Sequence, residues 1–191
     1  MHTSIATSRP HRERGSMLIE LLFATTILTI GFGGILVLLT GSMYSNSRSS
    51  NDTTSTMLAE HILEQISSTP ANSNTALTIT DCAGTNWSIS VAGAAVNGGN
   101  GGSYGGNGAS LTSAAIVDWT QTYSNIPAGY AMQYVACGSG GKQITYDIRW
   151  DVVNMSTYTR MVMISARPVG SAYVGGLRYV VPVNLRTIAG M

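Results

Sequence analysis

Charged residues are scarce in this sequence, and their scarcity narrows the possible functions. Of the 191 residues, 10% are charged, and the formal net charge is +1. Proteins that hold nucleic acid through its phosphates usually present a dense basic surface. The composition therefore gives no firm indication of nucleic acid or of any acidic partner. Abundant Gly, Ser, Thr and Asn are instead the composition that we associate with exported β-rich domains.

Groups suited to acid–base or metal chemistry are also few. The histidines are His2, His11 and His61. The carboxylates after Pro70 are Asp81, Asp118, Asp147 and Asp151. Asp147 and Asp151 would lie about 13 Å apart along an extended strand, too far to share one cation. We therefore expect no catalytic function, no cofactor and no metal site.

Cysteine is limited to Cys82 and Cys137, and no Cys-x-x-Cys motif occurs. An isolated pair in an exported domain indicates one disulfide more readily than free thiols, a metal pair or a redox site. In the chain-entropy model, a bond that closes a loop of about 56 residues stabilises the fold by about 4 kcal/mol.

Charge is absent altogether between Glu20 and Arg48. About 20 apolar residues in a helix cross the hydrocarbon core of a bilayer, so this segment predicts a membrane span. Only a poor cleavage site follows it, at Thr40 to Ser42, which favours a retained anchor over an ordinary signal peptide. Arginines concentrate before the span, so the positive-inside rule predicts a cytoplasmic N-terminus.

Glu20 is the exception, because it stands just inside the start of the apolar segment. A charged side chain costs about 2.5–3.5 kcal/mol at the bilayer centre and less near an interface. Glu20 therefore needs a functional reason, or the segment does not enter a membrane.

Helical periodicity continues beyond Arg48. Apolar residues recur at Leu58, Ile62 and Ile66, with Leu63 widening the stripe, and Pro70 ends the pattern. We expect one long helix over residues 17–68, with residues 45–56 frayed or kinked because they are poor helix formers.

After Pro70 the period changes to two, which predicts strands. The expected strands are residues 143–153, 158–168 and 177–186, joined as an antiparallel meander, and two shorter ones within 76–80 and 86–92. Their apolar face is expected to receive the helix stripe, and their polar face, with Arg149 and Arg160, to be solvated. Pro182 cannot donate a ladder hydrogen bond, so the last strand is expected to be an edge strand or to carry a bulge.

Residues 97–110 form a glycine-rich loop. No Lys-Ser or Lys-Thr follows it, so a phosphate-binding role is not favoured. Its composition predicts a flexible surface insertion.

The stretch "RERGSMLIELLFATTILTIGFGGILVLL" resembles the leader and N-terminal helix of type IV pilins and pseudopilins. The portion "ILTIGFGGILVLL" is especially similar to PilV-type minor pilins and to minor pseudopilins of type II secretion. The resemblance implies cleavage by a prepilin peptidase between Gly15 and Ser16, methylation of the new amine, and a retained glutamate, Glu20, that contacts the N-terminus of a neighbouring subunit. Ser16 stands where Phe or Met is commonest, and no proline interrupts the helix.

Within the span, small residues recur at Thr25, Thr29 and Gly33. Such a stripe allows a second helix to approach closely. Stripes of this kind are also common in membrane helices that pack on nothing specific.

The expected architecture is therefore α+β and pilin-like. It comprises a cleaved leader (1–15), a transmembrane and assembly segment (16–44), an amphipathic segment (45–69) and an antiparallel β domain (70–191). The expected function is that of a minor pilin-like subunit, held in the bacterial inner membrane and then incorporated into a pilus with other pilins. A type II secretion pseudopilin, and a surface adhesin or DNA-uptake module, remain the alternatives.

Overall fold

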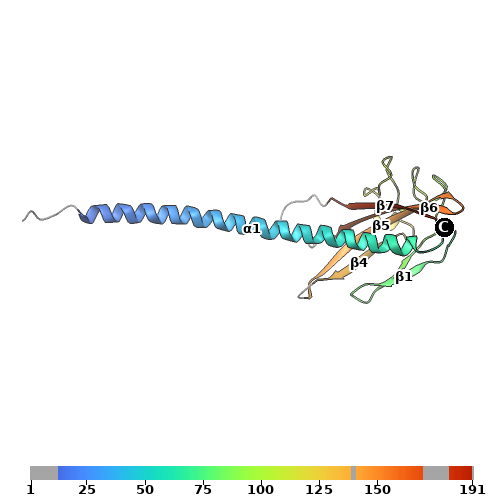
Figure 1. Ribbon diagram of the computed structural model, residues 1–191, viewed down its shortest axis with the longest axis horizontal. Coiled ribbons are helices and arrows are strands. Elements are labelled where there is room, and N and C mark those ends of the chain that lie inside the picture. Colours follow the sequence, from blue (N-terminus) through green and yellow to red (C-terminus); the bar gives the residue numbers. More distant parts are fainter. Residues whose placement is uncertain (1–12, 139–140, 170–180, 191) are drawn as a thin grey trace, which may run out of the picture. The chain divides into compact units, whose positions relative to one another are not determined.

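The structure is a computed structural model that describes residues 13–138, 141–169 and 181–190. Contacts divide the chain into two compact units, Met1–Arg48 and Ser49–Met191. Figure 1 shows the elements, with the long helix α1 and a β domain. The observed class is α+β, as predicted.

One uninterrupted helix, α1, runs over Glu13–Ser67. It includes residues 45–56, so the fraying expected there is not observed. Threonine hydroxyls in this stretch donate to carbonyls one turn earlier, for example Thr53 Oγ1 to Ser49 O at 2.9 Å. These bonds satisfy the hydroxyl groups within the helix itself.

In the second unit, five strands form one antiparallel sheet (Figure 1). The central strand is β5 (Gln143–Ser156), which pairs with β6 (Thr159–Pro168) along one edge. Its other edge is shared by β4 (Ala131–Cys137) and the two-residue β3 (Asn107–Gly108). β7 (Val183–Gly190) pairs with β6 and is the last strand in the sheet order.

A hairpin of β1 (Leu77–Thr80) and β2 (Asn86–Ile89) forms a separate two-stranded sheet. Its turn is fastened to β4 by the predicted disulfide, Cys82–Cys137, with an S–S distance of 2.06 Å. The Cys82 amide also donates to Val135 O at 3.2 Å. The disulfide therefore ties the hairpin to the main sheet.

The core forms where the C-terminal part of α1 packs on one face of the sheet. Ala59, Ile62 and Ile66 of α1 are fully buried in one cluster with the strand residues. The members from β5 and β6 on the alternating apolar positions are Tyr146, Ile148, Trp150, Val152, Val162, Ile164 and Ala166. Ile148, Trp150 and Val152 pair across the strands with Ala166, Ile164 and Val162, so the predicted apolar face and the helix stripe are both confirmed.

The opposite face of β5 differs from the prediction. Arg149 is 3% exposed and Asp151 is 0% exposed, although this face was expected to be solvated. The chain between β2 and β4 covers it: Trp119 stacks on Arg149, and Gly106 bonds to Asp151. Arg160, on the helix-facing side, is also fully buried.

The glycine-rich loop is not the freely exposed insertion that was expected. Gly101, Gly105, Gly106 and Gly108 are buried. A β-carbon added to Gly106 would lie 2.1 Å from Val152 O and 2.6 Å from Ala94 O. The glycines therefore allow the loop to lie directly on β5, which is a packing requirement that composition alone does not reveal.

Strand boundaries account for the remaining differences. β3 and β4 were not predicted, and β5 continues through Ser156, so its turn to β6 is Thr157–Tyr158. β7 begins after Pro182, and the N-terminal part of the strand expected over 177–186 lies outside the described residues. Pro182 therefore precedes the edge strand instead of interrupting it.

Candidate functional site

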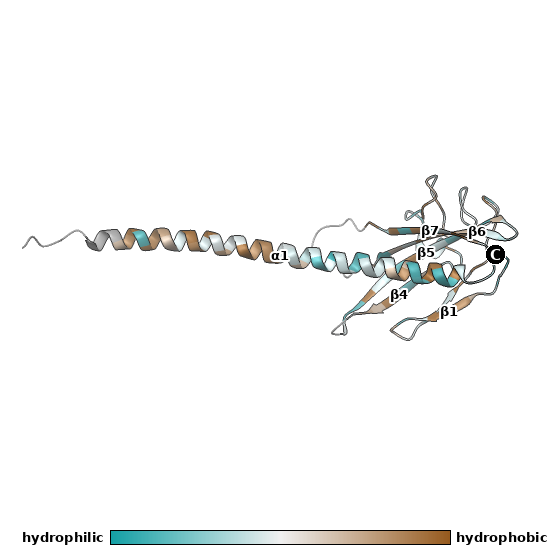
Figure 2. Cartoon of the chain, viewed as in Figure 1, coloured by the Kyte–Doolittle hydropathy of each residue, from teal (hydrophilic) through white to brown (hydrophobic). Residues whose placement is uncertain are grey.

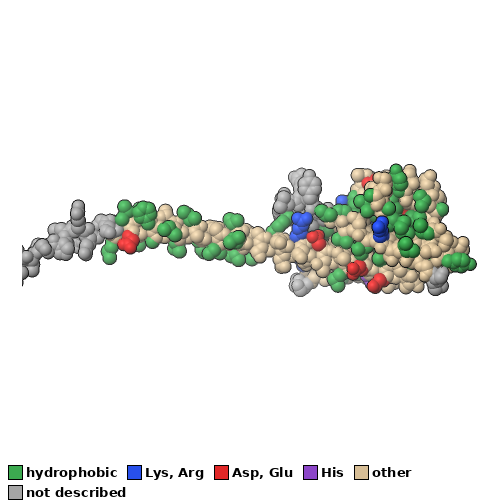
Figure 3. All heavy atoms as spheres, turned by 45° about the horizontal axis from the view of Figure 1, so that its top comes forward, with side chains coloured by type: hydrophobic (Ala, Val, Ile, Leu, Met, Phe, Trp, Pro, Cys, Tyr) green, Lys and Arg blue, Asp and Glu red, His purple; other side chains and the backbone are tan. Residues whose placement is uncertain are grey.

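The N-terminal half of α1 has an exposed apolar surface. Its large apolar side chains from Met17 to Met43 are all exposed, at 48–77%. Hydropathy is high along this segment (Figure 2), and Figure 3 shows apolar side chains over it. It is the one helix among the described residues that is long and apolar enough to cross a membrane. An exposed apolar surface of this extent marks a membrane or protein contact.

Glu20 lies within this surface and is exposed. It stands between Ile19 and Leu21, which are 59% and 66% exposed. Gly15 and Ser16 lie one turn earlier in α1, whereas most of the expected leader (1–12) lies outside the described residues. The carboxylate is therefore placed at the start of the apolar surface, close along the helix to the expected processing point.

The stripe of small residues satisfies its own polar groups. Thr25 Oγ1 donates to Leu21 O at 3.0 Å, and Thr29 Oγ1 donates to Thr25 O at 2.7 Å. A β-carbon added to Gly33 would meet nothing within 4 Å. The stripe can therefore face lipid or another helix without leaving an unpaired hydroxyl.

Arg160 of β6 fastens the last turn of α1 to the sheet. Its guanidinium donates to Thr69 O at 2.8 Å, to Ile66 O, to Thr69 Oγ1, and to Val91 O at 3.1 Å. The last carbonyls of a helix lack partners within the helix and carry partial negative charge. Burial lowers the pKa of Arg160, but these acceptors suit a positive charge.

A stack of cations and rings covers the opposite face of the sheet. Trp119 makes cation–π contacts with two guanidinium groups, with Arg149 Cζ 4.4 Å and Arg167 Cζ 4.0 Å from the ring centroid. The indole N–H donates to Ser165 Oγ at 2.9 Å, and Arg149 is paired with Asp147 at 2.8 Å. Burial lowers the pKa of Arg167, while Asp147 opposes that effect. The stack holds the covering segment on β5 and β6.

Asp151 is the second buried acid of this face. Its Oδ1 accepts a hydrogen bond from the Gly106 amide at 2.8 Å, and its Oδ2 has no partner. Burial raises its pKa to about 7, which the Gly106 hydrogen bond only partly offsets. Asp151 and Asp147 lie on the same face, as the strand period predicts, but no group of three potential metal-binding side chains occurs among the residues described.

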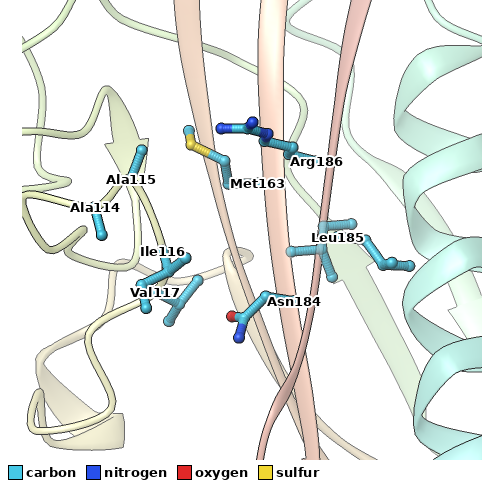
Figure 4. A pocket seen from close by; sticks show the side chains of 9 residues that line it. Ala114, Ala115, Ile116, Val117, Met163, Asn184, Leu185 and Arg186 are labelled. Atoms are coloured by element: carbon cyan, nitrogen blue, oxygen red, sulfur yellow. The ribbon is translucent and has the colours of Figure 1, made fainter.

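A shallow pocket of about 160 Å³ lies between the turn at residues 114–117 and strands β6 and β7 (Figure 4). Ile116 and Val117 point toward it from the turn, and Asn184 points toward it from β7. Pockets for drug-sized ligands are typically about 300–1,000 Å³. This pocket is smaller, and of the described residues that line it only Arg186 is charged.

Comparisons with protein-family models, with curated protein sequences and with solved structures find no match to this chain.

The structure therefore keeps the predicted processing and assembly residues on one helix, and adds two buried groups, Arg160 and Asp151, and a partly buried one, Trp119, that sequence reasoning missed. No motif in the sequence singles these residues out. Arg160 and Asp151 lie in strands of alternating pattern, and Trp119 lies in a stretch that was not predicted to form a strand. The available signal was a combination of two features: the β5 sequence contains charged residues, and the loop over residues 97–110 is uncharged and rich in glycine. Such a segment can lie close over buried polar groups.

Proposed function

We propose that the chain is a minor pilin-like structural subunit of a type IV pilus. In this proposal a prepilin peptidase removes residues 1–15. The mature chain is then anchored in the bacterial inner membrane with its N-terminus on the cytoplasmic side. It then enters the filament through the N-terminal half of α1 and helps to initiate or modify assembly. The β domain lies outside the cytoplasm, where its disulfide is stable.

The observation that carries the proposal is the position of Glu20. The acid stands at the start of an exposed apolar helix surface and five residues after Gly15 along the chain. A lone carboxylate in apolar surroundings is unfavourable unless an opposite charge meets it. In the pilin-like pattern that charge is the amine of a neighbouring subunit, so the pair sets the register between helices.

Incorporation into filaments tests the role of Glu20. We expect Glu20→Gln to reduce recovery of the subunit in sheared surface filaments by at least about tenfold. The substitution removes the carboxylate, so the positively charged amine of the neighbouring subunit has no ionic partner. Its amount in the membrane fraction and its cleavage should remain those of the parent chain. Quantitative immunoblotting of both fractions, in cells with a complete pilus machinery, provides the measurement.

Glu60→Gln is the matched control, since Glu60 is an exposed acid of the same helix outside the apolar segment. It should be recovered like the parent chain. Equal recovery of Glu20→Gln and Glu60→Gln in filaments would contradict the proposed role.

A minor pseudopilin of type II secretion is the alternative within the same class, because the same helix features support it. The two proposals differ in the machinery that recruits the chain. Recovery with pilus components or with secretion-system pseudopilins, after crosslinking in cells, separates them.

A further inference from the structure

The unpaired oxygen of Asp151 points into the glycine-rich loop. Asp151 is fully buried, and only its Oδ1 has a hydrogen-bond donor, the Gly106 amide. A β-carbon added to Gly101 would lie 1.9 Å from Oδ2, and one added to Gly105 would lie 2.6 Å from it. Both glycines of the loop therefore lie close against this oxygen.

Main-chain carbonyl oxygens lie beside the same two glycines. The β-carbon position of Gly105 is 2.3 Å from Gly101 O, and that of Gly101 is 2.9 Å from Gly106 O. The loop thus brings hydrogen-bond acceptors to the neighbourhood of Oδ2, which has no donor of its own. An ionised carboxylate would be repelled by these dipoles, whereas a protonated oxygen could donate to one of them.

The charged groups nearby do not stabilise the ionised form of Asp151. On β5 itself, Arg149 is engaged by Asp147 and by Gln121 O at 2.7 Å. The cross-strand partners of Asp151 are Met163 of β6 and Gly108 of β3. Tyr130 donates its hydroxyl to Ala92 O at 2.6 Å, and burial and the Asp151 charge raise its pKa.

The loop brings no compensating charge either. Within residues 97–110 the only titratable side chain is that of Tyr104, which is 53% exposed at the loop surface. Burial without a cation explains why the pKa of Asp151 rises to about 7.

We propose that Asp151 is a proton-controlled latch for the glycine-rich loop. In its neutral form, Oδ2–H donates to a main-chain carbonyl of the loop, while Oδ1 holds the Gly106 amide, so that residues 97–106 stay on β5. When the loop lifts, the carboxyl group ionises in water and its proton passes to the solvent, which favours the open form. The latch does not depend on the proposed pilus role.

A bound metal ion is a poorer occupant than a proton. Calcium takes six to eight oxygen ligands at about 2.3–2.6 Å. Among the described residues no group of three potential metal-binding side chains occurs, and Gly101 and Gly105 lie so close to Oδ2 that a β-carbon on either would collide with it. A proton needs no added volume.

The direction of the pH dependence follows from linkage. The carboxyl group has an ordinary pKa of 3.8 when the loop is open and one of about 7 when it is closed. Below the lower value both forms are protonated and the latch is at full strength. Between the two values, opening becomes up to about tenfold more favourable per pH unit, and it levels off above the higher value.

Hydrogen–deuterium exchange of the full chain in detergent micelles tests the latch. After correction for intrinsic exchange, protection of amides in 97–106 should fall by about tenfold between about pH 5 and pH 6, fall less toward pH 7, and then level off. Asp151→Asn should keep protection nearly constant, because its amide donates where the protonated acid did. Asp118→Asn, which alters a partly exposed acid bonded to Thr120, should follow the parent chain.

Three results would overturn the proposal. Parent-chain protection could be independent of pH, Asp151→Asn could lose protection as the parent does, or excess calcium at neutral pH could restore the acid-state protection. If Asp151→Asn does not fold, the carboxyl carbon of Asp151 in the parent chain, followed by NMR, decides instead. A midpoint near neutrality supports the latch, and a group ionised throughout from about pH 5 contradicts it.

Discussion

At the scale of single residues, the structure depends on a buried positive charge whose partners among the described residues are carbonyl and hydroxyl oxygens instead of a carboxylate. Arg160 is the clearest case, since its guanidinium is 0% exposed and bonds only to carbonyl and hydroxyl oxygens. A cation is tolerated there because the C-terminal carbonyls of α1 and the Val91 carbonyl converge on it. One side chain therefore joins the end of the helix, the chain after β2 and the sheet.

Replacing Arg160 should destabilise the β domain. In Arg160→Met the stem remains, but the carbonyls of Thr69 and Val91 lose their donor, while that of Ile66 keeps the donors of Thr69. A buried polar group without a partner costs about 1–3 kcal/mol, so we expect a loss of about 3 kcal/mol or more in the free energy of unfolding. Urea unfolding followed by tryptophan fluorescence measures it, because Trp87, Trp119 and Trp150 all lie in the second unit.

Arg186→Met is the control, because Arg186 is an exposed residue of β7. It should change the free energy of unfolding by less than about 0.5 kcal/mol. A similar small change in Arg160→Met would show that the guanidinium contacts do not hold α1 on the sheet.

At the scale of elements, the glycine-rich loop packs closely on β5. Gly106→Ala would place a methyl group against two backbone carbonyls that cannot move aside, those of Val152 and Ala94. We expect destabilisation of about 1–3 kcal/mol, the usual cost of overpacking. Urea unfolding at acidic and neutral pH measures it.

Gly138→Ala serves for comparison, since its β-carbon would meet Lys142 O at 3.6 Å, an ordinary contact. This variant should be nearly neutral. If Gly106→Ala were equally harmless, the loop would have to be looser on β5 than its contacts indicate.

The sequence predicted elements where one pattern determines the outcome. The helix stripe containing Ile62 and Ile66 and the apolar face of β5 follow directly from periods of 3.6 and 2. The polar face could not be predicted in this way, because alternation does not say what covers it. Arg149 and Asp151 are buried by a segment whose own pattern is neither helical nor extended.

The disulfide and the glycines show the same division. An isolated cysteine pair allows only one intramolecular bond, so Cys82–Cys137 could be predicted without knowledge of the fold. The role of Gly106 depends on Val152, which is 46 residues later in the chain, and composition carries no information about such a contact. Among site residues, Glu20 was found because it interrupts an uncharged run, whereas Arg160 has no comparable local signal.

At the scale of the whole molecule, the two units require different surroundings. The unit before Ser49 exposes its apolar side chains, while the second unit encloses a core and a disulfide. A helix surface of the first kind is stable in lipid or against other helices. This contrast, together with the position of Glu20, is why we favour a subunit that moves from a membrane into a filament.

The N-terminus of the mature chain tests this account most directly. Mass spectrometry should find a chain that begins at Ser16 in cells with prepilin peptidase, and an uncut chain in cells without it. Gly15→Ala should leave the chain uncut even in cells with the peptidase. A chain that remains uncut in the presence of the peptidase, or one that begins after Ser42, would contradict the account and leave a plain membrane-anchored or secreted β domain.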